Sequence, residues 1–435
     1  MKVDRRSLGS LPVSLLVGYA AWALTSLLLS VRLAFVGSLE QAVRWGGFCD
    51  ALWFAALGLI TAGWYELSTR ATGRPRTLLR IVTACSLLEL AWTPVRSVLG
   101  LWSLGHLPAW AAGLLSGAEI VIGGISLVAA VAMLIAAEAW RRERVLTGCF
   151  IGLLVLRDVT FYVPAINAAL WAHPRVTQLA ISAVTLGWSA VVVLVAGLFA
   201  QDHPAVEPSA LVARRGLGRA SSAIWFSILS AFGVGLMFVT SIRSYATMRA
   251  VVIGAPLVAV VALIGFAWGL LDAARSRLAG LSSWLLASSA VAVLWYAAIL
   301  VRHAFSLSRI LTRGEDDPSR VYVEVIRSWQ IVGPVVGLVG MVLAIHAISR
   351  FALARANFAL REAATVRGLL FVVLMGSAIA LQLQVDKARS ESGLLVILLS
   401  AVVAAIGALI ALAQTCRRGA EAIAADTSLP AARLV

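Results

Sequence analysis

The chain has 435 residues, of which 61% are hydrophobic and only 13% are charged. Soluble globular proteins carry about 25% charged residues, so this composition excludes a soluble protein and indicates that lipid is the main solvent. The net charge of +15 would suggest nucleic-acid binding in a soluble protein. Here the arginines lie in short groups between apolar stretches, which is typical of membrane topology, and we expect no nucleic-acid partner.

The apolar stretches predict an all-α polytopic membrane protein. A helix needs about 20 mostly apolar residues to cross a bilayer. Stretches of this kind occupy residues 11–31, 46–64, 81–102, 113–137, 147–169, 179–199, 223–242, 251–271, 281–301, 331–348, 369–385 and 394–415. The first is longer than the apolar core of a signal peptide, about 7–15 residues, and we interpret it as a retained helix.

A polar, proline-containing stretch divides these twelve predicted helices equally. We therefore expect two six-helix lobes, at residues 1–200 and 223–416, joined by a cytoplasmic connector at 201–222 and followed by a frayed cytoplasmic tail at 417–435. The equal helix count suggests a duplicated unit. A short similarity supports it: Gly63 precedes Glu66 and Arg70 at the end of the second helix, as Gly269 precedes Asp272 and Arg275 at the end of the eighth.

The arginines predict the orientation of the chain. With the N-terminus in the cytoplasm, the inside loops hold more arginines than the outside loops beside them, except beside the long outer loop at 302–327. Positive residues flank membrane spans on the cytoplasmic side. We therefore expect an integral protein of the plasma (inner) membrane, with both termini in the cytoplasm.

Five charged residues lie inside the predicted spans of the first lobe, and they define the candidate site. They are Glu89, Arg96, Glu119, Arg157 and Asp158. A charge in the bilayer costs at least about 2.5 kcal/mol, so such residues face a protein interior or a wet cavity. At about 1.5 Å per residue, Glu89 and Arg157 both lie roughly 12–15 Å from the inner surface, whereas Arg96 and Glu119 lie in the outer half of the membrane.

This depth pairing predicts two ion pairs, Glu89 with Arg157 and Arg96 with Glu119, and leaves Asp158 to carry a proton or a cation. Trp92 lies three residues after Glu89 on the same helix face, and we expect it to line the same substrate- or ion-binding site. The alternative is that all five charges form a structural network that holds three helices together.

Motifs for other chemistry are missing from the sequence. It contains no GxGxxG, GxxxxGK[ST], HExxH or GxSxG pattern, so we expect neither an enzyme nor a bound cofactor, although an intramembrane enzyme using the carboxylates stays open. The histidines and the four separated cysteines have no metal-ligand spacing. Three Gly-x-x-x-Gly patterns, starting at Gly113, Gly265 and Gly333, predict close helix packing within the chain.

In helix count, cytoplasmic termini and central connector, the chain resembles transporters of the major facilitator type. Its nearest match to their motif between the second and third helices is formed, with a different spacing, by Gly63, Glu66, Arg70, Gly73, Arg74 and Arg76. Multidrug and lipid-linked-sugar flippases share this organisation. We expect a secondary transporter or flippase for a small-molecule or lipid-linked substrate. The alternative is a non-catalytic membrane subunit (scaffold, anchor or sensor) with membrane-protein partners and structural charges.

Overall fold

The computed structural model describes residues 11–35, 39–102, 109–162, 174–203, 209–241, 245–313, 320–382 and 391–427. Throughout these ranges the regular secondary structure is helical and contains no strand. Nine helices in this part of the chain are long and apolar enough to cross a membrane, which indicates an integral membrane protein. The count of twelve spans stays a prediction.

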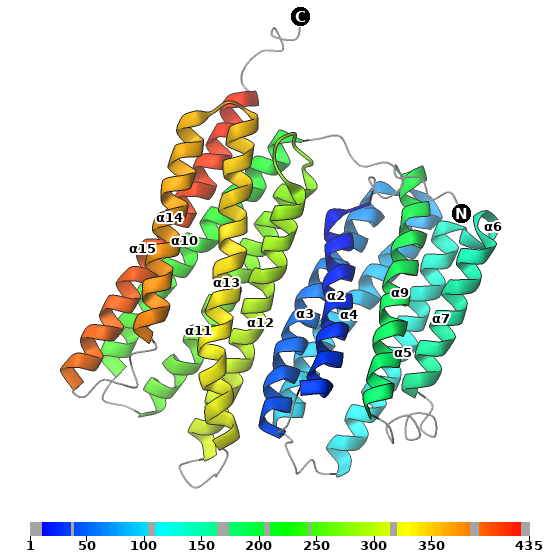
Figure 1. Ribbon diagram of the computed structural model, residues 1–435, viewed down its shortest axis with the longest axis horizontal. Helices are drawn as coiled ribbons and strands as arrows, with labels where there is room; N and C mark the ends of the chain where they lie inside the picture. Colours follow the sequence, from blue (N-terminus) through cyan, green and yellow to red (C-terminus); the bar gives the residue numbers. More distant parts are fainter. Residues whose placement is uncertain are drawn as a thin grey trace, which may run out of the picture. The chain divides into compact units, whose positions relative to one another are not determined.

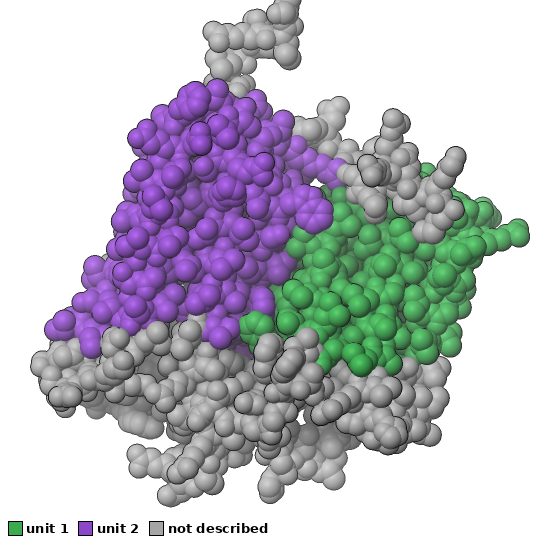
Figure 2. Space-filling model, viewed as in Figure 1, with its two compact units in different colours: residues 1–206 green, residues 207–435 purple. Residues whose placement is uncertain are grey.

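The chain divides into two compact units, residues 1–206 and 207–435 (Figure 2). The described part of the first unit contains six long helices and, between α5 and α7, the four-residue helix α6 (Ala139–Arg142) (Figure 1). The long helices are α2 (Val13–Phe35), α3 (Leu39–Arg70), α4 (Gly73–Trp102), α5 (Ala109–Ala137), α7 (Arg144–Tyr162) and α9 (Pro174–Asp202).

The second unit also contains six long helices among its described residues. They are α10 (Ala210–Ser241), α11 (Tyr245–Arg275), α12 (Ser283–Arg313), α13 (Arg320–Ala354), α14 (Phe358–Gln382) and α15 (Glu391–Thr427). The nine candidate spans lie in α2, α3, α5, α9 and α11 to α15.

The two units have the same internal order of helix contacts. In the first, each long helix packs against the next in chain order, α9 closes the ring against α2, and α5 also contacts α9. In the second, the helices again pack in chain order, α15 closes the ring against α10, and α13 contacts α15. Each unit is therefore a closed ring in which the fourth helix also contacts the sixth.

Glycines bring the first two helices of each ring close together. A Cβ atom on Gly63 of α3 would lie 2.8 Å from the backbone nitrogen of Leu15 on α2, and one on Gly269 of α11 would lie 2.6 Å from the backbone nitrogen of Ala220 on α10. A side chain at either position would collide with the facing backbone, so only glycine allows this approach. The similarity noticed around Gly63 and Gly269 thus marks an equivalent helix crossing in both units.

Two of the three predicted glycine pairs pack within the chain, and the third differs. Gly265 and Gly269 face α10, and Gly333 and Gly337 face the ring of Tyr296 on α12. In contrast, a Cβ atom on Gly117 would have no neighbour within 4 Å in the described structure. The surroundings of Gly113 lie outside the described residues, so the predicted packing of this pair stays a prediction.

The helices extend further than the apolar stretches suggested. α10 begins at Ala210, inside the stretch expected as a connector, and α15 continues to Thr427, inside the expected tail. α13 ends at Ala354 and α14 begins at Phe358, so the chain turns tightly between them. The side-chain oxygen of Asn357 in this turn accepts a hydrogen bond from the backbone N–H of Leu360 at 3.0 Å. Asparagine is a preferred residue at this helix-start position.

Candidate functional site

Glu89 of α4 faces the interior of the first unit. The residues seven, four and three positions before it, Val82, Cys85 and Ser86, are all buried, so this helix face is the covered one. The partly buried Glu89 carboxylate forms a hydrogen bond with the side chain of Ser126 on α5 and interacts electrostatically with Arg157 on α7. Three helices therefore meet at this carboxylate.

Arg157 reaches the same interior from α7. It follows the buried residues Phe150 and Leu154 by seven and three positions, which puts it on the inner face of its helix. Its guanidinium carbon lies 4.8 Å from the ring centroid of Trp188 on α9, within the range of a cation–π interaction. Trp188 in turn packs against Phe150, with ring centroids 4.7 Å apart.

Tyr19 connects these charges to the first two helices. This buried residue of α2 interacts electrostatically with both Glu89 and Arg157, and Trp64 of α3 donates a side-chain hydrogen bond to it. Tyr19 also stacks on Trp22 at 5.7 Å between ring centroids. The Glu89–Arg157 cluster, as we name Tyr19, Trp64, Glu89, Ser126, Arg157 and Trp188, thus takes one residue from each of the six long helices of the unit.

The chemistry of this cluster follows from its two charges. A carboxylate in low dielectric can bind a proton or a cation, and a guanidinium can bind a carboxylate or phosphate through two parallel hydrogen bonds. Removing one member of a buried pair leaves the other charge uncompensated. An ion or substrate that competes for either member would therefore disturb contacts to several helices at once.

The structure brings together two of the six residues proposed from sequence. Glu89 and Arg157 lie within electrostatic range of each other. Their predicted ion pair and their binding role stay predictions. Trp92 is partly buried on α4, one turn after Glu89. The side chains of Arg96, Glu119 and Asp158 lie outside the described residues, and so does their pairing.

Sequence reasoning missed the uncharged members of the cluster. Ser126 and Tyr19 are common residue types in membrane helices, and only the rotation of each helix tells which of them faces a charge. Trp188 gave a usable signal, because a tryptophan in the middle of a predicted span is unusual for a residue that prefers the membrane interface. Pairing such tryptophans with arginines at similar depth would have found it.

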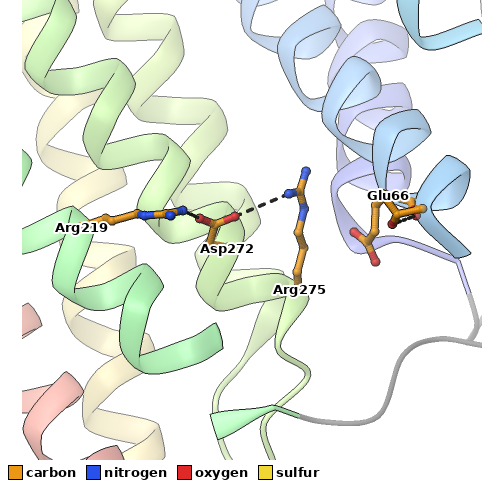
Figure 3. A network of polar contacts seen from close by, with 5 residues as sticks. Glu66, Arg219, Asp272 and Arg275 are labelled. Atoms are coloured by element: carbon orange, nitrogen blue, oxygen red, sulfur yellow. Dashed lines mark hydrogen bonds and ion pairs between the residues drawn. The ribbon is translucent and has the colours of Figure 1, made fainter. Parts of the chain in front are cut away.

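Ion pairs also occur where α3 and α11 end. Glu66 accepts a hydrogen bond from Arg70, four residues later on α3, and the Arg70 side chain is almost fully buried. In the second unit Asp272 lies between Arg219 of α10 and Arg275, which is 3.5 Å away on α11 (Figure 3). The acid that follows the crossing glycine is therefore paired with arginine in each unit.

The described residues contain no group of three or more His, Cys, Asp or Glu side chains that could hold a metal ion. Comparisons with models of known protein families, with curated proteins and with solved structures gave no match.

Proposed function

We propose that the protein is a secondary transporter or flippase whose site lies inside the first six-helix unit, at the Glu89–Arg157 cluster. The observation that carries this proposal is that a carboxylate from α4 and a guanidinium from α7 lie within electrostatic range of each other on the inner faces of apolar helices. Charges at membrane depth are costly, and they mark substrate or ion pathways in many membrane proteins.

The cluster offers a simple coupling mechanism. Binding of a proton or cation at Glu89 would weaken its attraction to Arg157, and Arg157 would then be able to bind an anionic group of the substrate. Because the cluster takes residues from all six long helices, this exchange would favour a different packing of the ring. Asp158, next to Arg157 in the sequence, is the second proposed carrier of the proton or cation.

The repeated architecture supports the same proposal. Many transporters consist of two repeats, and they alternate access to a central site by moving one bundle against the other. The equal ring order of the two units and their equivalent Gly63 and Gly269 crossings are what such a duplication would produce. We propose on this basis that the chain has twelve membrane spans in two lobes with both termini in the cytoplasm of the plasma membrane.

A substrate-independent labelling experiment tests this function. The four cysteines are replaced by alanine, Ser126→Cys is introduced, and a membrane-impermeant methanethiosulfonate is applied from either side of the membrane. An alternating-access site predicts labelling of position 126 from both sides. Ser182→Cys is the matched control, since Ser182 is buried between α2 and α9 and hydrogen-bonds with Ser26. Protection of position 126 from both sides would overturn the proposal.

A second function, a non-catalytic membrane subunit, is favoured by the burial of the cluster. Tyr19, Trp64 and Trp188 are each at most 5% exposed, as expected for a sealed structural network. In the described part of the second unit, the fully buried polar side chains are serines and threonines rather than charged residues. Under this alternative the protein acts through membrane-protein partners, and position 126 stays unlabelled.

A further inference from the structure

The helical hairpin formed by α13 and α14 carries an excess of positive charge, and the ion pairs among the described residues of the second unit involve other arginines. Arg350 lies four residues before the end of α13, and Arg361 and Arg367 lie three and nine residues after the start of α14. Both Arg350 and Arg361 are exposed. Among the described residues, none of these three arginines has an acidic partner.

Arg367 is the unusual member of this group. It follows the buried residues Leu360 and Ala364 by seven and three positions, so it lies on the covered face of α14. One of its terminal nitrogens, Nη1, is buried and has no hydrogen-bond partner in the described structure. A buried guanidinium nitrogen without an acceptor is costly, and an anion bound by the rest of this partly exposed guanidinium would lower that cost.

The position of Arg367 along the helix fits a lipid phosphate. The uninterrupted apolar stretch of α14 begins at Gly368, immediately after Arg367, and residues 369–385 were predicted to cross the membrane. Arg367 therefore lies where the hydrocarbon region begins, roughly 14 Å along the axis from the turn. Arg350 and Arg361 lie roughly 5–6 Å from the turn, and so roughly 8–9 Å from the level of Arg367 on the polar side. Gly368 faces Ile345, so α13 and α14 are in contact at this level.

The exposed face of α14 is apolar at the same level, roughly a third of a turn around the helix from Arg367. The α14 span has the smallest buried share of the nine described candidate spans, 17%. Val366, Leu369 and Val373, which follow one another at helical spacing, are each about 60% exposed. A ligand for this hairpin therefore needs an anionic group at the level of Arg367 and a long apolar part that covers α14. Those two properties together define an anionic phospholipid.

We propose that the α13–α14 hairpin binds the phosphate headgroup of an anionic phospholipid through Arg367, with Arg350 and Arg361 providing further positive charge. Anionic lipids are abundant in the cytoplasmic leaflet, and this arginine-rich end of the unit is the one predicted to be cytoplasmic. The site lies in the second unit and is independent of the function proposed for the Glu89–Arg157 cluster.

Native mass spectrometry of the purified full chain in a neutral detergent tests this site, with phosphatidylglycerol and phosphatidylcholine as competing lipids. The wild type is expected to prefer phosphatidylglycerol, and Arg350→Gln with Arg367→Gln to lower that preference at least ten-fold, about five-fold per arginine near a charged surface. Arg214→Gln with Arg215→Gln is the matched control, since both arginines are exposed on α10 at the same end of the unit. This control is expected to change the preference less than two-fold.

Three results would overturn the proposal: no preference in the wild type, an equal loss in the control, or displacement of the lipid by soluble glycerol phosphate. The last result would assign the site to a free phosphate compound. Thermal unfolding in phosphatidylcholine nanodiscs checks that the variants are folded. If Arg367→Gln does not fold, Arg367→Lys, which keeps the charge but loses the two parallel hydrogen bonds, is expected to lower the preference partially.

Discussion

Replacing Arg157 with methionine is the perturbation whose size follows most directly from the structure. The substitution keeps an apolar side chain against Trp188 but leaves the Glu89 carboxylate without its cation. Removing one partner of a buried ion pair costs about 3–5 kcal/mol. Because Glu89 is only partly buried and keeps its hydrogen bond to Ser126, we expect a loss near the lower end, about 3 kcal/mol in the free energy of unfolding.

The double variant measures the interaction between the two charges separately from their contacts with other residues. Glu89→Gln with Arg157→Met removes both charges, so no unpaired charge is left, and we expect it to be less destabilised than the sum of the two single variants by about 1–3 kcal/mol. Unfolding in mixed micelles of dodecyl sulfate and a neutral detergent, followed by the fluorescence of the 15 tryptophans, measures all three variants. The reversible midpoint and slope give the free energies.

Arg142→Met is the control for this series. Arg142 pairs with Asp202 at 2.5 Å, but the two side chains are 36% and 47% exposed, so its loss is expected to cost about 1 kcal/mol or less. If Arg157→Met costs no more than Arg142→Met, or if the effects of the Glu89 and Arg157 variants simply add, the two charges do not form a buried pair.

Three other predictions test the fold and its orientation. Gly269→Ala is expected to destabilise the protein by about 1–3 kcal/mol in the same unfolding assay, because its new methyl group meets the α10 backbone. Gly376→Ala, with open space around it, is expected to be neutral or stabilising by up to about 1 kcal/mol. A change of the same sign for both variants would refute the close crossing of α10 and α11. Ser182→Ala removes hydroxyl contacts between α2 and α9 and is expected to lower the free energy of unfolding by about 1 kcal/mol. The exposed Ser377→Ala is expected to change it hardly at all. Equal losses in both variants would contradict an interhelical role of Ser182. In the cysteine-free chain, Arg418→Cys is expected to react with an impermeant reagent only from the cytoplasmic side, and labelling only from outside would reverse the proposed topology.

Composition was enough to predict a helical membrane protein, and depth along the helices was enough to predict that Glu89 and Arg157 lie within electrostatic range of each other. Depth along a helix depends only on the number of residues from its end, so two charges at equal depth can be matched without a structure. Rotation about the helix axis is not readable in the same way, because the sequence does not tell which face of an apolar helix is covered. The identity of the neighbouring helices is not readable either, which is why Ser126 and Tyr19 were missed.

The helix ends were harder to predict than the apolar centres. α10 begins at Ala210 and continues through Arg214, Arg215 and Arg219, although hydropathy places the membrane only after them. Arginine is a good helix former, and a helix that leaves the membrane gains from continuing where tertiary contacts support it. Gly216, within this polar section, packs against α11 and provides such a contact. Hydropathy reports the membrane boundary, and helix length is decided separately by packing.

Cross-linking between positions 89 and 157 tests whether Glu89 and Arg157 face each other inside the first unit. In the cysteine-free chain, Glu89→Cys and Arg157→Cys are introduced together and treated with a short bifunctional thiol reagent, and a protease site in the segment 103–108 separates the two halves of the product. The account predicts that the fragments stay linked and that Ala91→Cys, on the exposed side of α4, does not link to position 157. Efficient linking from position 91, with none from position 89, would show that Glu89 does not face Arg157 inside the first unit.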